Sequence, residues 1–278
     1  MRLLLLVVLA SSFGPVRSAR AEDRGQFDWR APRASYWWDG GAIPFLYLPL
    51  AMNLGYRAFR EPPTEPVMFS KMEGGQSYDG GQYPVTMLWV DALAAGGAIV
   101  LAGDDSRWHH AKGFAQGLAM TSMMTALAKS TFGRHRPMYD LGDGAVNKMD
   151  SSKSFWSGHS AMTLATATYL GLYARQHLFD RFRPKGTLPW WEVASYAALA
   201  VGAAAIPYSQ YHLNRHHASD VITGSLVGAT VAGLAYWFQE RNYRRDKAHP
   251  SEVGNPEPMS ISILPGSSMR GLSVSGVW

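Results

Sequence analysis

Apolar residues recur with a helical period along most of the chain beyond residue 85. No stretch there shows the strict alternation and the enrichment in β-branched residues that indicate a central sheet. The period predicts five long helices, over residues 86–102, 113–129, 160–177, 191–206 and 221–240. Residues 43–54 add a short helix that two prolines interrupt. The chain is therefore expected to be all-α, a helical bundle of about five to six core helices.

Polar, glycine-rich or proline-rich segments separate these helices. The connections fall at residues 103–112, 133–157, 180–190 and 207–220, and a long loop is predicted over residues 61–84. From residue 261 to the end, weak alternation surrounds Pro265-Gly266. A small C-terminal β-hairpin is expected there.

The first residues have the layout of a secretory signal. Arg2 precedes the apolar run 3–10, and Ala19-Arg20-Ala21 offers a small-residue cleavage site. The apolar run is far shorter than the roughly 20 residues that a membrane span needs. We therefore expect an exported, periplasmic protein. Its parts would be a signal peptide over residues 1–21, an aromatic and loop region over 22–85, a helical domain over 86–240 and a tail over 241–278.

Charge and cysteine content exclude several classes of function. The formal net charge is +5, and removal of residues 1–21 takes away Arg2, Arg17 and Arg20 and no acid, which leaves +2. So small a charge gives no argument for nucleic-acid binding. The chain has no cysteine, which excludes disulfides, thiolate metal ligands and a thiol nucleophile.

Two cations stand near the end of the second long helix. Lys129 and Arg136 are separated by six residues, and Pro137 indicates that the helix has ended before Arg136. A guanidinium fork and an ammonium group together suit a phosphate. For this pair alone, a basic helix C-terminus stabilised by the helix dipole is the alternative.

A Ser-Gly-His triplet comes directly before the third long helix. Ser157, Gly158 and His159 precede an Ala/Thr/Leu run that begins at residue 161. Unpaired N–H groups and the positive end of the dipole make a helix start an anion site. In the first turn, His159 is placed to act as a general acid toward a bound oxyanion.

A histidine and an aspartate stand four residues apart at the start of the last long helix. This spacing lets the Asp220 carboxylate hold one imidazole nitrogen of His216 and leave the other as a nucleophile. A lone histidine is more often structural than catalytic. Here two histidines, two cations and a carboxylate all lie at the ends of predicted helices, and the joint pattern indicates an anion-transfer site.

Taken in order, these residues resemble a known signature. The chain matches the three-part motif of the type 2 phosphatidic acid phosphatase superfamily with Lys129-x6-Arg136-Pro137, Ser157-Gly158-His159 and Ser209-x6-His216-x3-Asp220. That superfamily also contains the bacterial class A acid phosphatases and the vanadium haloperoxidases. The resemblance covers about residues 86–240 and implies a helical bundle with the active site at one end.

The resemblance also implies a role for each residue. His216 would attack phosphorus to give a phosphohistidine, Asp220 would orient it, and His159 would protonate the leaving oxygen. The residues that would hold the phosphate oxygens are Lys129, Arg136, Ser157, Gly158 and, in place of the usual arginine, Gln210. No metal ion or other cofactor is implied, because fixed cations and helix-end amides stabilise the charge. The expected protein is a metal-independent phosphatase for phosphate monoesters, in particular lipid phosphates.

Two positions depart from the family pattern. Trp156 replaces the usual proline before Ser-Gly-His, which alters the loop packing or gives the substrate mouth an aromatic face. Gln210 replaces an arginine, and loss of that planar cation would cost on the order of a hundredfold in rate. Arg215 adjoins His216 but would point about 100° away on a helix. Two alternatives stay open: a phosphate- or phospholipid-binding protein with impaired turnover, and a vanadium haloperoxidase.

Hydropathy bears on whether the bundle lies in a membrane. The mean hydropathy is −0.13, and most of the predicted helices are short for a span. Basic residues at 175–185 and 241–247 suit a positive-inside arrangement, and they equally suit ordinary helix C-termini. We expect a soluble or membrane-peripheral periplasmic protein that acts on a phosphate ester or phospholipid. An integral inner-membrane protein with a periplasmic site is the alternative.

Overall fold

The computed structural model describes residues 43–59, 85–102, 104–137, 152–183, 188–248, 260–264 and 271–275. The predicted signal peptide, the aromatic segment that follows it as far as residue 42, and the loop over residues 61–84 lie outside these ranges. The proposed domain boundaries stay predictions.

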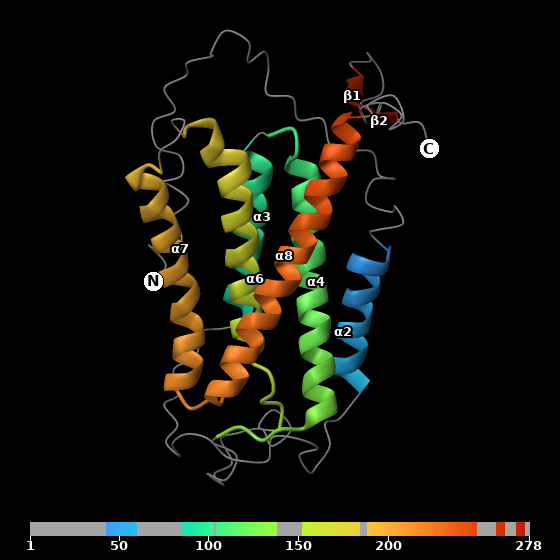
Figure 1. Cartoon of the computed structure of the whole chain (residues 1–278). Coiled ribbons are helices and arrows are strands. Elements are labelled where there is room, and N and C mark those ends of the chain that lie inside the picture. The colour runs from blue at the N-terminus through green and yellow to red at the C-terminus, as the bar shows by residue number, and fades with distance from the viewer. Residues whose placement is uncertain are drawn as a thin grey trace.

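The described chain is a bundle of long helices, so the all-α prediction is confirmed (Figure 1). Its helical elements are η3 (Ile43–Tyr47), α2 (Leu48–Phe59), α3 (Val85–Leu101), α4 (Arg107–Phe132), α6 (Gly158–Tyr173), η5 (Ala174–Leu178), η6 (Phe179–Arg181), α7 (Trp190–His212) and α8 (Ala218–Ala248). The expected C-terminal hairpin is also present, as the antiparallel pair β1 (Ser260–Leu264) and β2 (Gly271–Ser275).

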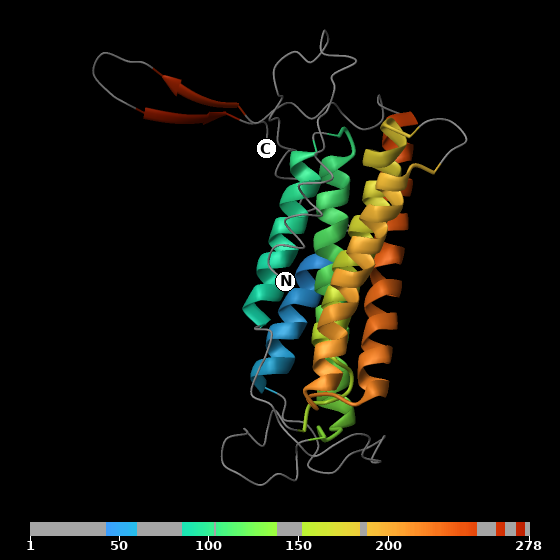
Figure 2. The ribbon, with the colours of Figure 1, turned by 90° about the vertical axis from the view of Figure 1, so that its left-hand side faces the viewer.

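Helix connectivity gathers three helix ends at one end of the bundle. The last turn of α4, the first turn of α6 and the turn from α7 into α8 all lie at the lower end in Figure 1, and the view turned by 90° in Figure 2 agrees. The start of α4, the end of α6 and the end of α8 lie at the other end. The predicted motif residues sit on the first set of helix ends, so the fold brings them together.

Helix α8 packs closely against α6 through small residues. Added Cβ atoms at Gly224 and Gly228 would overlap the carbonyl oxygens of Ser157 and Ala161 respectively. Around this contact the core is filled by aromatic and aliphatic side chains of α3, α4, α6 and α8, which include Ile99, Phe114, Leu118, Tyr169, Tyr173 and Tyr236.

Three of the long helices extend beyond their predicted bounds by six residues or more. Helix α4 begins at Arg107 instead of residue 113, because polar residues such as His110 are buried inside the bundle and hide its apolar face from a hydropathy pattern. Helix α7 continues through Pro207 to His212, so the loop predicted from residue 207 was wrong over its first residues. One interior proline removes one backbone hydrogen bond, which tertiary packing can offset. Helix α8 runs on to Ala248.

Large apolar side chains lie exposed on the outer faces of the bundle. They include Leu93 on α3, Val201 on α7, and Leu226 and Leu234 on α8, each more than half exposed. Within the described ranges, α8 is the one helix long and apolar enough to cross a membrane by length and composition, a test that core helices of soluble proteins also pass. These features are compatible with membrane association.

The close approach of α6 and α8 gives a stability prediction. Gly228→Ala should lower the free energy of unfolding by about 1–3 kcal/mol or more, because the new methyl group has to displace the backbone of α6. Gly233→Ala on the same helix is the matched control. Nothing lies within 4 Å of a Cβ there, so alanine should stabilise by up to about 1 kcal/mol. Denaturation followed by circular dichroism measures both, and equal stabilities for the two variants would contradict this packing.

Candidate active site

The predicted nucleophile and its carboxylate meet in the turn between α7 and α8. His216 lies in this turn and Asp220 in the first turn of α8, and Nδ1 of His216 is 3.8 Å from Oδ2 of Asp220. Both side chains are buried. With Nδ1 facing the carboxylate, Nε2 is the ring nitrogen left for chemistry.

Two residues that the sequence analysis did not single out hold Asp220. Arg134 donates from Nη1 to Oδ1 of Asp220 at 2.6 Å, and Ser154 donates from its hydroxyl to Oδ2 at 2.5 Å. Ser154 Oγ also lies 3.5 Å from Nδ1 of His216, and the backbone N–H of His217 donates to Oδ2 at 3.2 Å. The carboxylate is thus fixed by a charge and by hydrogen bonds on both oxygens.

These contacts keep Asp220 ionised although it is buried. Burial alone would raise the pKa of the carboxyl group. The adjacent imidazole of His216, the hydrogen bond from Ser154 and the charge of Arg134 together outweigh burial and hold the pKa of Asp220 below its usual 3.8. An ionised Asp220 attracts the N–H at Nδ1 of His216 and so fixes the orientation of the imidazole.

His216 is neutral over the physiological pH range. Burial, together with the positive charges of Arg136 and Lys129, lowers the pKa of its imidazole to about 3 against the opposing effect of Asp220. A neutral ring carries a lone pair on Nε2. The same cations that keep His216 unprotonated would attract a phosphate to it.

The end of α4 directs the cationic residues toward this turn. Gly133 ends the helix in a left-handed conformation (φ 60°), which glycine adopts without strain. The chain that follows carries Arg134 and Arg136, and the carbonyl oxygen of Arg134 accepts a hydrogen bond from the N–H of Ser154 at 2.9 Å. Lys129 occupies the last turn of α4, and its Nζ would be 4.0 Å from a Cβ at position 158.

The Ser-Gly-His triplet forms the N-terminus of α6. Ser157 is the N-cap, and its hydroxyl oxygen accepts a hydrogen bond from the N–H of Ser160. Its backbone N–H donates to the carbonyl oxygen of Asp220 at 3.1 Å, which ties the start of α6 to the start of α8. Gly158 is the first residue of the helix, and His159 lies in its first turn, nearly buried.

The two departures from the family pattern also lie at this end of the bundle. Trp156 donates from Nε1 to Oγ1 of Thr125 at 2.9 Å and so attaches the loop before α6 to α4. The carbonyl oxygen of Gln210 accepts from the N–H groups of Arg215 and His216 at 3.1 and 3.2 Å. Its side chain is buried, and Nε2 has no hydrogen-bond partner among the described residues. Gln210 therefore offers a donor but no charge.

Arg215 is not placed as a helical residue would be. Because α7 ends at His212 and α8 begins at Ala218, Arg215 and His216 lie in a turn, and the 100° offset expected on a helix does not apply. Both residues are buried.

Arg134 and Ser154 were missed because their partner lies more than 60 residues away in sequence. The one available signal was that each stands within three residues of a motif residue.

Comparisons with known proteins give a consistent family. A family model described as PAP2 superfamily matches residues 111–244. Lipid A 1-phosphatase of Porphyromonas gingivalis is 33% identical over 158 residues, which are 55% of this chain and 30% of that protein. Phospholipid phosphatase 2 of Rattus norvegicus is 31% identical over 149 residues, 45% of this chain and 51% of that protein.

A longer match has lower identity. A PA-phosphatase related-family protein of Dictyostelium discoideum is 25% identical over 213 residues, 70% of this chain and 77% of that protein. The chain spans only 30% and 51% of the lengths of the first two relatives. No solved structure gives a significant match.

The buried ion pair generates a prediction for Arg134. Arg134→Gln should lower the free energy of unfolding by about 3–5 kcal/mol, because it leaves the Asp220 carboxylate buried without its cation. Adding Asp220→Asn should restore part of the loss by removing the uncompensated charge. Arg245→Gln is the control, since Arg245 is largely exposed and its pair with Asp246 is solvated. Chemical denaturation of the three variants measures the effect, and an Arg134→Gln protein as stable as Arg245→Gln would contradict it.

Proposed function

The chain belongs to the PAP2 superfamily through residues 111–244, and we propose that it is a metal-independent phosphatase that hydrolyses phosphate monoesters, in particular lipid phosphates. The observation that carries the proposal is the buried, neutral His216, held by Asp220 and lying in the field of Lys129 and Arg136. A lone pair fixed beside two cations is an arrangement suited to attack on a phosphate dianion.

In the first step, Nε2 of His216 attacks phosphorus while the bond from phosphorus to the ester oxygen breaks. His159 donates its proton to that oxygen, so the alcohol leaves neutral. Asp220 accepts a hydrogen bond from Nδ1 and stabilises the positive charge that develops on the ring. The product of this step is a phosphohistidine on His216.

In the second step, His159 acts as a base. It takes a proton from water as the water oxygen attacks phosphorus, and the bond from phosphorus to Nε2 breaks. Inorganic phosphate leaves, and both histidines return to their starting protonation states. No metal ion takes part in either step.

The oxygens of the phosphate would be held by fixed donors. Lys129 and Arg136 supply the positive charge, and Gly158 supplies an N–H at the start of α6. Ser157 and Gln210 add neutral donors. Replacement of an arginine by Gln210 reduces the charge at the site, so we expect slower turnover than an enzyme with that arginine, with the mechanism unchanged.

A lipid substrate is supported by the surface around the site. Exposed apolar side chains lie on the turns next to His216, on the last two turns of α7 and the first three turns of α8, and they include Tyr208, Tyr211, Ile222 and Leu226. Acyl chains would contact such a surface. The names of two relatives, lipid A 1-phosphatase and phospholipid phosphatase 2, agree with this substrate class. We propose accordingly that the protein is exported and works at the periplasmic face of a membrane.

Substitution of the nucleophile tests the proposal. With phosphatidic acid in detergent micelles and a chelator present, the wild-type protein should release inorganic phosphate, and His216→Ala should release none above background. His159→Ala should lower kcat by about 10²–10⁴-fold, the usual contribution of a general acid. His212→Ala, an exposed histidine at the end of α7, is the control and should keep wild-type activity.

Two results would count against the proposal. Full activity in His216→Ala would remove the assigned nucleophile, and complete loss of activity on adding the chelator to folded protein would remove metal independence. A kcat/KM for phosphatidic acid no higher than that for a small soluble phosphate ester would leave the phosphatase in place and remove the lipid preference.

A further inference from the structure

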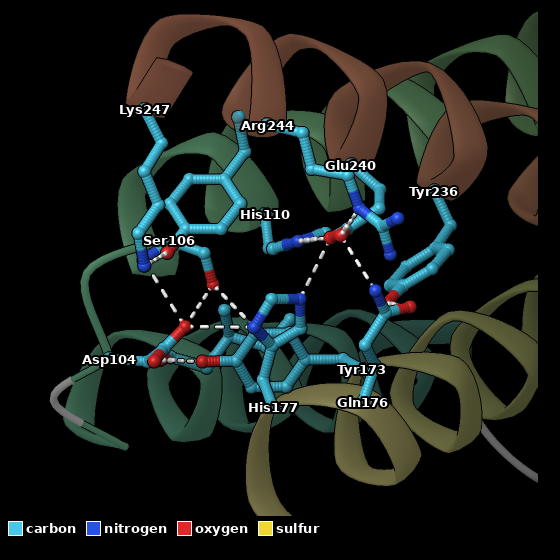
Figure 3. A network of polar contacts seen from close by, with 12 residues as sticks. Asp104, Ser106, His110, Tyr173, Gln176, His177, Tyr236, Glu240, Arg244 and Lys247 are labelled. Carbon is cyan, nitrogen blue, oxygen red and sulfur yellow. Dashed lines mark hydrogen bonds and ion pairs between the residues drawn. The ribbon is translucent and has the colours of Figure 1, made fainter. Parts of the chain in front are cut away.

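A second buried cluster of polar residues lies at the end of the bundle opposite His216. His110 comes from the start of α4, His177 from η5 after α6, and Glu240 from the last part of α8 (Figure 3). All three side chains are buried. Along α4, His110 and Lys129 are about 28 Å apart at the helical rise of about 1.5 Å per residue. The proposed phosphatase mechanism uses none of these residues.

The two histidines converge on one oxygen of Glu240. Nε2 of His110 lies 3.2 Å from Oε2 of Glu240, and Nε2 of His177 lies 2.8 Å from the same oxygen. The other oxygen, Oε1, accepts hydrogen bonds from Nε2 of Gln176 at 2.6 Å and from Nε of Arg244 at 2.5 Å. The donors on Oε1 orient the carboxylate, and Oε2 is directed at both imidazoles.

His177 lies between two carboxylates. Its Nδ1 is 2.9 Å from Oδ2 of Asp104, and its Nε2 is 2.8 Å from Oε2 of Glu240. A neutral imidazole has one N–H, so one of its nitrogens turns a lone pair toward a carboxylate oxygen. The charges of Glu240 and Asp104 are balanced by Arg244 and Arg181. What the cluster lacks is therefore one proton between an imidazole nitrogen and a carboxylate oxygen.

We propose that this cluster is a binding site for a divalent transition-metal ion, Zn²⁺ in the first instance, with Nε2 of His110, Nε2 of His177 and Oε2 of Glu240 as ligands. The ion lies between the two imidazoles and Glu240, and its binding moves the proton of a neutral ring from Nε2 to the other nitrogen. Each histidine then carries its proton on Nδ1.

The outer nitrogens of both histidines already have acceptors for that proton. Nδ1 of His177 can donate to Oδ2 of Asp104, and Nδ1 of His110 can donate to the hydroxyl oxygen of Tyr169 at 3.2 Å. A carboxylate or hydroxyl behind a ligating histidine fixes its tautomer and raises its basicity. Ring stacking fixes the planes: His110 stacks on Tyr236 at 4.9 Å between centroids, and His177 on Tyr173 at 5.1 Å.

The donor set and its spacing select the kind of ion. Two imidazoles and one carboxylate suit Zn²⁺, Co²⁺ or Ni²⁺, whereas Mg²⁺ and Ca²⁺ prefer all-oxygen sites. Bonds of about 2.0–2.1 Å in a tetrahedral zinc site place neighbouring ligand atoms about 3.3 Å apart. The observed separations of 3.2 and 2.8 Å from Oε2 to the two nitrogens need only a small expansion to accept the ion.

The ion would have a structural effect, because it would link α4, the segment after α6 and α8 at the end remote from the phosphate site. A ligand that binds the folded state alone stabilises it. This inference is independent of the proposed phosphatase activity.

Metal titration of the full chain tests the inference. Tag-free protein is stripped with chelator, desalted, and titrated with Zn²⁺, Co²⁺ or Mg²⁺. We expect one Zn²⁺ per chain by calorimetry and by metal analysis, and a rise in Tm with Zn²⁺ that Mg²⁺ does not produce. Co²⁺ should give the intense visible absorption of a low-coordinate site with nitrogen ligands. Wild-type protein with no zinc binding, no cobalt band and no rise in Tm would overturn the proposal.

Variants locate the bound ion. Glu240→Gln and His177→Gln should lose the zinc stoichiometry and the cobalt band, and Asp104→Asn should weaken zinc affinity by about 10–100-fold while keeping one ion per chain. His109→Gln, next to His110 on α4 and partly exposed, is the matched control and should bind as wild type does. His216→Ala should bind zinc normally while losing phosphatase activity.

Retention of one tightly bound zinc ion in Glu240→Gln, or its loss in His216→Ala, would overturn the assignment. If Glu240→Gln fails to fold, the comparison of Asp104→Asn with His109→Gln still tests the site. Equal zinc affinity in these two variants would show that Asp104 does not support a zinc ligand at His177, and would overturn the assignment.

Discussion

The buried ion pair between Arg134 and Asp220 is the contact on which the proposed active site depends. It joins the chain after α4 to the first turn of α8, and Ser154 brings the loop before α6 to the same carboxylate. Both contacts help to keep Asp220 ionised in this buried position. The orientation of His216 relies in turn on that carboxylate. A substitution of Arg134 would therefore disturb catalysis without removing any group that contacts the substrate.

A second constraint, the width of the site, is set by helix packing. The start of α6 carries Gly158 and His159, and the start of α8 follows His216. Gly224 and Gly228 allow α8 to approach the backbone of α6 directly, and the N–H of Ser157 donates to the carbonyl oxygen of Asp220. The distance between the proposed acid and the proposed nucleophile is thus fixed by backbone contacts, which vary little as side chains move.

Sequence reasoning recovered the parts of this protein that short-range rules control. The helical period gave the fold class and the existence of each long helix, and the motif residues gathered because they all stand at helix ends that alternate in direction. The four-residue spacing of His216 and Asp220 predicted a contact that the structure contains at 3.8 Å.

What sequence reasoning missed depends on pairings across long separations. Arg134 acquires a role only from Asp220, which lies 86 residues away. The polar residues in the first turn of α4 predict a loop, because the sequence does not show that His110 is buried against Glu240, 130 residues away. The loop predicted from Pro207 is also wrong, because the packing of α7 keeps the chain helical where the local propensity of proline would end the helix. In each case a tertiary contact overrides the local signal.

In the proposed mechanism, His216 is the residue that carries the phosphoryl group between the two steps. Rapid quenching with radiolabelled p-nitrophenyl phosphate tests it directly in His159→Ala, because this ester loses its leaving group without an acid while water attack still needs a base. We expect labelled protein that is stable to base and labile to acid, with the label on the peptide that contains His216 and none in the double variant with His216→Ala. Label on a different residue, or hydrolysis that inverts configuration at phosphorus, would contradict it.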